Sequence, residues 1–473
     1  MDTIQIIAVA IFAVTFFFIL TERIHRTVIG LAGAVAMLIA GIAFHFYEPH
    51  EAIAAVDFNT LGLLFGMMVI VAILEETGVF QALGIWTAKK TRGSPWYLML
   101  GLGLLTSVLS MILDNVTTII LIVPVTIIVA RVLGINPAPI LLAEAILSNV
   151  GGTGTLIGDP PNIMIGSAAG FSFNDFLMHT LPVVLVAWIA TVFVLRWLFK
   201  DELAKKPRSI DELLKMDEHE AITDWPTLTK TLWVLGFTVI LFFLHGALHL
   251  DAAVVALIGA SLALLLVHAT KDPQPVLQRT ELSVLLFFGA LFVIVGGLEH
   301  AGVLELLAAA ISSGAADNLL LTALVVLWAS AILSAIVDNI PMTVAMIPII
   351  GFLAAEGIEV NLLWWALALG VGFGGNITPI GSTAGIIVTS KSEHTDDPIS
   401  FKRWLATGTP AAFTGLTIAS IFLIIYHQSG YVTGGSFVEG TMEGMHGAPV
   451  EEQVEAPIDD PVTEPGTEES IVR

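Results

Sequence analysis

The same polar interruption occurs twice inside long apolar runs of this sequence. Ser-x-x-x-Asp-Asn is followed after eight residues by proline at residues 110–124, and again 224 residues later at 334–348. A glycine-rich segment follows each copy, GGTGTLIGDPPN at 151–162 and GGNITPIGS at 374–382. Paired polar breaks in repeat register are typical of secondary transporters that are built from two structural repeats.

The composition places the chain in a membrane. Apolar residues make up 56% of it and the mean hydropathy is +0.89. Runs of about 18–22 apolar residues recur, each long enough to cross the hydrocarbon core. These spans exclude a soluble enzyme, and the absence of alternating ten-residue strands argues against an outer-membrane barrel. The absence of cysteine excludes disulfides and thiolate metal sites.

Charge predicts the topology. With the N-terminus outside, every one of the 19 Lys and Arg residues except Arg473 falls in a cytoplasmic loop. Five crossings in each repeat would then invert the second repeat relative to the first. We predict a first transmembrane repeat (1–199), a cytoplasmic linker (200–229), a second, inverted repeat (230–427) and a disordered acidic tail (428–473).

Each Asp-Asn pair lies at the centre of a paired apolar segment without a turn-rich loop around it. An acidic turn at membrane depth is tolerated only where protein or a wet cavity surrounds it, so we expect re-entrant hairpins. The fold class predicted is an all-α polytopic membrane protein with two inverted-topology repeats. Each repeat has five spans, a re-entrant hairpin and a broken helix.

The glycine-rich segments are expected to unwind their helices. Glycine lets the backbone approach a ligand closely, and Pro160-Pro161 cannot continue a helical hydrogen-bond ladder. Opposed helix ends and unwound carbonyls then face each other near the membrane centre, where they can bind an ion. A kink or a close helix crossing is the alternative for a single cluster, whereas two clusters in register favour a site.

Carboxylates inside the membrane mark functional sites, because an unpaired charge there costs several kcal/mol. Burial also favours the neutral form, so proton and cation compete for such groups. We predict proton coupling by Asp114, Asp338, Glu144 and Asp159. Glu75 and Glu299 lie near predicted span ends, where a capping or solvated role is as much expected as a functional one.

Oxygen-bearing side chains and unwound backbone complete the predicted site. A sodium ion is expected at Asp114, Asn115, Asp338 and Asn339. The wider set of expected ion or substrate contacts adds Asn149, Gly151, Gly152, Thr153, Thr155, Asp159, Asn162, Thr343, Gly374, Gly375, Asn376, Thr378 and Ser382.

The motifs at 148–162 and 374–382 resemble the arsenite-permease/NhaD-antiporter branch of the ion transporter superfamily, and the resemblance covers residues 1–430. It implies inverted repeats with hairpins and broken helices, in a homodimer with scaffold and transport domains. Related dicarboxylate carriers have Ser-Asn-Thr at both hairpin tips. Here the matching residues are Asp-Asn-Val (114–116) and Asp-Asn-Ile (338–340), and the added negative charge favours a cation over an anion.

The sequence thus predicts a sodium–proton antiporter in the cell membrane, with both termini outside. The alternatives are proton-coupled efflux of arsenite or of an organic or inorganic anion, and an anion channel. The expected partners are the lipid bilayer, a small ion or solute and a second copy of the chain. No nucleic acid and no cofactor besides transported Na⁺ and H⁺ are expected.

Overall fold

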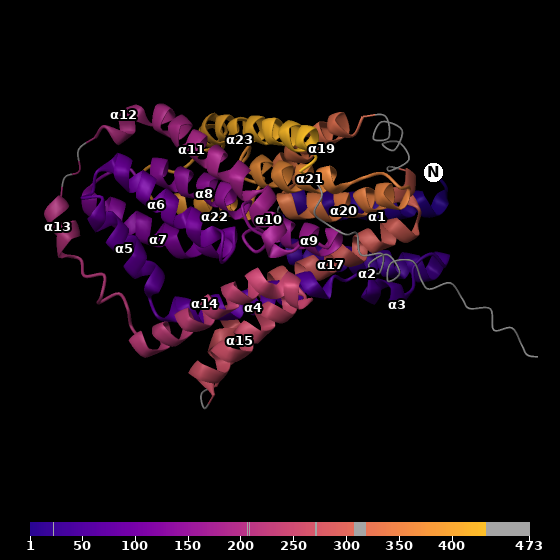
Figure 1. Cartoon of the computed structure of the whole chain (residues 1–473), viewed down its shortest axis with the longest axis horizontal. Coiled ribbons are helices and arrows are strands. Elements are labelled where there is room, and N and C mark those ends of the chain that lie inside the picture. Colours follow the sequence, from indigo (N-terminus) through magenta and orange to yellow (C-terminus); the bar gives the residue numbers. More distant parts are fainter. Residues whose placement is uncertain (22, 206, 208, 270–271, 307–317, 432–473) are drawn as a thin grey trace, which may run out of the picture. The chain divides into compact units, whose positions relative to one another are not determined.

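The computed structural model describes residues 1–21, 23–205, 207, 209–269, 272–306 and 318–431, and within them every regular element is a helix (Figure 1). The first repeat contains α1 (Thr3–Thr21), α2 (Arg26–Phe44), α3 (Pro49–Ala54), α4 (Phe58–Glu76), α5 (Val79–Lys90), α6 (Pro95–Ser110), α7 (Asn115–Leu133), α8 (Ala138–Gly152), α9 (Pro160–Ala169), α10 (Phe173–His179) and α11 (Leu181–Leu198). Nearly all of the tail predicted from residue 428 lies outside the described residues.

The linker and the second repeat follow. They contain α12 (Lys200–Leu203), α13 (Ile210–Lys215), α14 (Trp225–Leu248), α15 (Ala252–His268), α16 (Gln274–Arg279), α17 (Leu282–His300), α19 (Leu319–Val337), α20 (Asn339–Ala355), α21 (Asn361–Gly374), α22 (Thr383–Ser392) and α23 (Phe401–Ser429). The first helix of the second repeat, α14, begins a little before the predicted boundary at 230. Eight helices of the described chain are long and apolar enough to cross a membrane.

Helix packing reproduces the internal repeat. In each half the first hairpin arm packs on the broken helix that follows it, α6 on α8 and α19 on α21. Other pairs join the two halves, and each has a counterpart in which the corresponding helices of the two repeats are interchanged. α4 packs on α15, and correspondingly α17 packs on α2. In the same way α7 packs on α22, and α20 packs on α9. Such matched exchange is what a pseudo-two-fold relation between the repeats produces.

The first hairpin ends beside the break of its own repeat. Ser110 Oγ donates to the Ser148 carbonyl of α8 at 2.9 Å, and Thr155 Oγ1 in the break donates to the Met111 carbonyl in the turn at 2.6 Å. The turn therefore lies level with the middle of the broken helix, as expected of a re-entrant hairpin. These bonds also satisfy carbonyls that the interrupted helices leave without partners.

The second hairpin is fixed in the same way. Ser334 Oγ donates to the Val371 carbonyl at 3.2 Å, and Thr378 Oγ1 donates to the Ala335 carbonyl at 2.5 Å. Matching hydroxyl groups thus link hairpin and break in both halves, and both predicted broken helices are present.

Some of the predicted cytoplasmic loops contact neighbouring segments through ion pairs. Lys89 pairs with Glu218 of the linker at 2.5 Å, and Arg279 contacts Glu75 and Glu76 at 3.4 and 3.3 Å. Glu75 therefore forms an ion pair at the end of α4.

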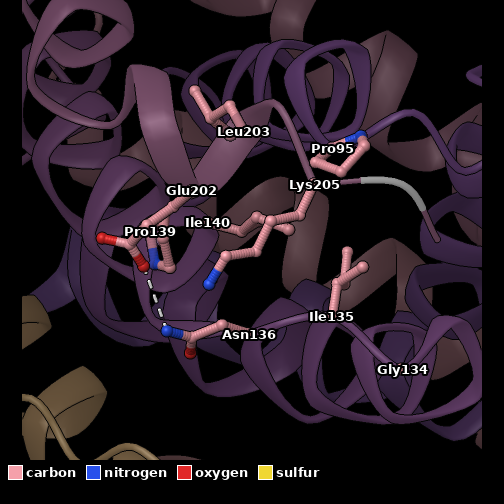
Figure 2. A pocket seen from close by; sticks show the side chains of 9 residues that line it. All are labelled: Pro95, Gly134, Ile135, Asn136, Pro139, Ile140, Glu202, Leu203 and Lys205. Atoms are coloured by element: carbon pink, nitrogen blue, oxygen red, sulfur yellow. Dashed lines mark hydrogen bonds between the residues drawn. The ribbon is translucent and has the colours of Figure 1, made fainter.

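A polar cluster ties the linker to the second repeat. Arg403 donates to both carboxylate oxygens of Glu202, at 3.0 and 2.8 Å, and contacts Asp397 at 2.5 Å. Asn136 donates to the same two carboxylates at 3.1 and 2.6 Å. Figure 2 shows Glu202 and Asn136 beside a cavity of about 430 Å³ that Lys205 also lines. The cluster therefore joins three segments that are distant in sequence.

Arg403→Gln is expected to destabilise the protein by about 1 kcal/mol at neutral pH, because a partly exposed ion-pair network is lost. The hydrogen bond that Asp397 accepts from Arg403 holds the pKa of the Asp397 carboxyl below its usual range. A carboxyl group whose pKa is lower in the folded than in the unfolded state stabilises the fold at pH values above its unfolded-state pKa. This contribution disappears as the pH falls through its folded-state pKa. Thermal unfolding in detergent should therefore show a smaller difference between variant and wild type in acid. Lys402→Gln, an exposed neighbour, is the control, and an equal melting temperature for Arg403→Gln and Lys402→Gln would contradict the prediction.

Candidate functional site

The two broken helices cross at their breaks. Asn149 of α8 donates from Nδ2 to Asn376 Oδ1 and to Ser382 Oγ of the second repeat, both at 2.8 Å. At the matching position of α21 stands Gly372, where an added Cβ would collide with Thr153 Oγ1. The structure thus brings together three predicted site residues from both repeats.

Asp159 lies at the centre of this crossing and is 1% exposed. Asn115 at the first hairpin tip donates from Nδ2 to Asp159 Oδ1 at 3.2 Å. Asn339 at the second tip donates to both carboxylate oxygens, also at 3.2 Å. Asn115 reaches Asn149 Oδ1 as well, at 3.2 Å. One carboxylate therefore connects both hairpin tips, and only the first break supplies it, because Ser382 stands at the matching position of the second.

Asp114 lies at the first hairpin tip, as predicted, and caps the helix that follows. Its Oδ1 accepts from the Thr117 amide and its Oδ2 from the Thr117 hydroxyl, both at 2.7 Å. Its carboxylate therefore caps the N-terminus of α7, where partial positive charge stabilises it. Ion binding and proton coupling by Asp114 stay predictions, and the side chain of the next residue, Asn115, points at Asp159.

Asp338 also lies at the edge of the cluster rather than its centre. Its Oδ2 contacts Arg26 Nη1 at 3.5 Å and accepts from Thr383 Oγ1 at 3.5 Å. Asp114 and Asp338 share a backbone peculiarity, with φ of +134° and +81°. Positive φ is rare outside glycine and concentrates at functional sites. In each tip this turn separates the Asp side chain from the Asn side chain that faces Asp159.

Other predicted ligands fix the backbone instead of facing the central carboxylate. Their side chains donate to main-chain carbonyls of their own repeat; these residues are Thr153, Thr155, Asn162, Thr343 and Thr378. They hold the breaks and tips in place and therefore position the residues that surround Asp159.

The predicted glycines permit close backbone approach. A Cβ at Gly151 would meet the Ser107 carbonyl oxygen of α6 at 2.7 Å. A Cβ at Gly152 would meet the Gly158 carbonyl oxygen at 2.5 Å. In the second repeat Gly374 packs against the backbone of α19, and Gly375 against Gly381. These four glycines have a packing role in bringing tips and breaks together.

Glu144 stands apart from the cluster. It is fully buried; its Oε1 accepts from Thr126 Oγ1 at 2.5 Å, and its Oε2 has no partner among the described residues. No contact joins it to Asp159 in the described chain, so proton coupling through Glu144 stays a prediction.

Arg26 is the site residue that sequence reasoning missed, since it entered only as one charge in the topology count. Its guanidinium donates to Thr383 Oγ1 at 2.9 Å, pairs with Asp338, and lies 5.5 Å from the ring centroid of Phe287. The available signal was an arginine at the first residue of an apolar helix. The partner of Arg26, Asp338, lies 312 residues further along the chain, so residue spacing does not indicate the pair.

The chemistry of the cluster suits a small cation or a proton. No group of three or more His, Cys, Asp and Glu side chains able to hold a metal occurs in the part of the chain that the structure describes. The carboxylate and amide oxygens of the cluster are hard ligands, the kind that hard cations prefer. Asn115 Oδ1 is buried and accepts no hydrogen bond from the described residues. The cluster thus offers one anionic oxygen pair and a free neutral oxygen.

Comparisons with known proteins agree with this architecture. A family model described as "Citrate transporter" matches residues 16–370. The chain is 38% identical to a 46 kDa membrane protein of Mycobacterium leprae and to an uncharacterized transporter of Mycobacterium tuberculosis, each over 89% of this chain and 98% of the relative. It is 31% identical to the P protein of Homo sapiens, over 90% of this chain and 60% of the human protein. The YdaH transporter of Alcanivorax borkumensis shares the fold, with a TM-score of 0.55, 15% identity and coverage of 83% of this chain and 90% of that one.

Proposed function

This membrane transporter belongs to the citrate transporter family, and from that premise we propose that it exchanges sodium for protons at a site centred on Asp159. The arsenite-permease/NhaD resemblance supports the same proposal. The single observation that carries it is the buried carboxylate that accepts hydrogen bonds from both hairpin tips.

Competition at one carboxylate accounts for exchange. When Asp159 is ionised, the amide groups of Asn115 and Asn339 donate to it. A cation at the carboxylate would require those amides to rotate and present Oδ1 instead, which either asparagine is able to do. A proton removes the charge that attracts the cation. Because the two ions compete, binding of one releases the other without a separate coupling path.

The surrounding groups have supporting roles in this proposal. Asp114 and Asp338 add negative potential, and Asn149, Asn376 and Ser382 join the repeats beside the ion. Relative movement of the repeats would expose the site to alternate faces. We further propose that the transporter is a homodimer in the cell membrane, with its termini outside.

Citrate transport is the second candidate, and the description of the matching family favours it. A citrate anion needs cationic or strong donor groups, and the guanidinium of Arg26 beside the central cluster is one such group. Arsenite efflux and an anion channel complete the alternatives. A channel shows no counterflow, whereas a carrier does.

Purified protein in liposomes that contain a pH-sensitive dye tests the proposal. External sodium should raise the internal pH, because sodium entry drives proton exit. Counterflow of labelled sodium should accompany it. Citrate or arsenite gradients that drive a response where sodium gives none would overturn sodium–proton exchange in favour of those substrates.

The proposed topology predicts opposite labelling of two single cysteines in this cysteine-free chain. Ser209 lies in the linker and Ser429 at the end of α23. In intact cells a membrane-impermeant thiol reagent should modify Ser429→Cys and spare Ser209→Cys until the membrane is opened. Labelling of Ser209→Cys with protection of Ser429→Cys would reverse the topology, and equal labelling or equal protection of both would discard it.

A further inference from the structure

A second cavity adjoins the cluster on the side of the second hairpin. Its volume is about 290 Å³, and its walls come from α1, α2, α17, the end of α19 and α22. His25, Arg26, Asp338 and Thr383 supply its polar lining, with Ile380 of the second break beside them. The first repeat thus lines the cavity from α1 and α2, and the second repeat lines it from α17, the hairpin tip and the break.

Arg26 stands between this cavity and the hairpin tip. Three contacts hold its guanidinium: the Thr383 hydroxyl, the Asp338 carboxylate and the face of Phe287. The side chains of Arg26 and Asp338 are 26% and 11% exposed, so the pair is reachable from the cavity while the carboxylate is largely covered. A cation on the first repeat therefore neutralises an acidic tip of the second.

The guanidinium also has a second carboxylate within electrostatic range. Glu281, the residue before α17, interacts with Arg26 through space. An arginine within electrostatic range of two carboxylates can leave one for the other without becoming an unpaired charge, which would be costly in this partly buried setting.

We propose that the 290 Å³ cavity is an entrance to the ion site and that Arg26 is a tethered counter-cation there, which an entering cation displaces from Asp338 toward Glu281. The proposal rests on cation exchange as the function. Arg26 then competes with the transported ion and keeps the tip neutral between turnovers. Removal of its charge should tighten cation binding, whereas loss of a substrate ligand would weaken it.

Sodium binding to purified protein tests the competition without transport. Stabilisation against heat is measured against sodium chloride, with choline chloride added to keep the ionic strength constant. Arg26→Gln should lower the apparent sodium Kd by about fivefold, the effect of losing one partly exposed ion pair. Arg26→Lys should stay near the wild type, as should Arg279→Gln, which removes a remote pair.

Two results of this titration would overturn the inference. One is unchanged or weaker sodium binding in folded Arg26→Gln protein. The other is stabilisation of the wild type by citrate that Arg26→Gln abolishes, because Arg26 would then bind the substrate anion itself.

Cysteine labelling tests the entrance even if sodium–proton exchange fails in liposomes. A small cationic thiol reagent should modify Ile380→Cys, and faster when Arg26 is also Gln, because the cavity becomes more negative and Asp338 is uncovered. Ile157→Cys, at a position 2% exposed in the first break, should stay unmodified. Equal rates at Ile380→Cys with and without Arg26 would discard the role of Arg26, and an unmodified Ile380→Cys would discard the entrance. If liposomes show no sodium–proton exchange but the labelling rate at Ile380→Cys still depends on Arg26, only the exchange proposal would be discarded.

Discussion

Asp159→Asn is expected to abolish sodium-driven proton movement, lowering its rate by about 100-fold or more, equivalent to about 2.7 kcal/mol of barrier. The substitution keeps the side-chain shape but removes the charge for which sodium and proton compete. Folding should survive, because an asparagine oxygen still accepts from Asn115 or Asn339. The assay is the dye response of proteoliposomes after external sodium is added.

Glu299→Gln is the matched control for that experiment, since it neutralises a carboxylate near a helix end, outside the cluster. Its exchange rate should stay within about threefold of the wild type, under 1 kcal/mol of barrier. Wild-type exchange by Asp159→Asn protein would contradict the proposed site, whereas equal losses in both variants would point to a general effect of negative charge.

Gly151→Ala is expected to lower the stability of the protein. The new Cβ would meet the Ser107 carbonyl oxygen and Cα at 2.7 and 2.8 Å. Both atoms belong to the backbone of α6, so two helices must separate, and overpacking of this kind costs about 1–3 kcal/mol or more. Thermal unfolding and monodispersity in detergent should both show the loss.

Gly351→Ala is the control for this substitution. Gly351 lies in α20, and a Cβ there would meet nothing within 4 Å. Alanine in a helix interior is favoured over glycine by about 1 kcal/mol, so this variant should equal or exceed the wild type in stability. A Gly151→Ala protein as stable as Gly351→Ala would show that α6 and α8 do not pack as described.

Local signals explain what could be predicted from the sequence. Gly152 and Pro160 mark the limits of the first break because glycine and proline act on their own backbone. The Asp-Asn pairs mark the hairpin tips because a polar turn inside apolar runs needs burial in protein. The repeat then extends both inferences to the second half, where α21 and α22 frame the matching break.

Side-chain directions at the tips could not be predicted in the same way. The sequence predicts Asp114 and Asp338 as ion ligands, but it does not indicate that the next residues, Asn115 and Asn339, donate to Asp159. Arg26 reaches Asp338 because α2 packs on α17, which in turn packs on α20 of the second hairpin. Contacts of this kind depend on how distant helices meet, which residue spacing does not encode.

Proton release on sodium binding tests the shared carboxylate most directly. Sodium is added to purified protein in weakly buffered detergent solution, and the pH change is recorded alongside sodium binding. Competition at Asp159 predicts release of up to about one proton for each sodium bound, at a pH where the site is protonated, and no release from Asp159→Asn. Sodium binding without proton release across the pH range, or release that Asp159→Asn leaves unchanged, would contradict the account.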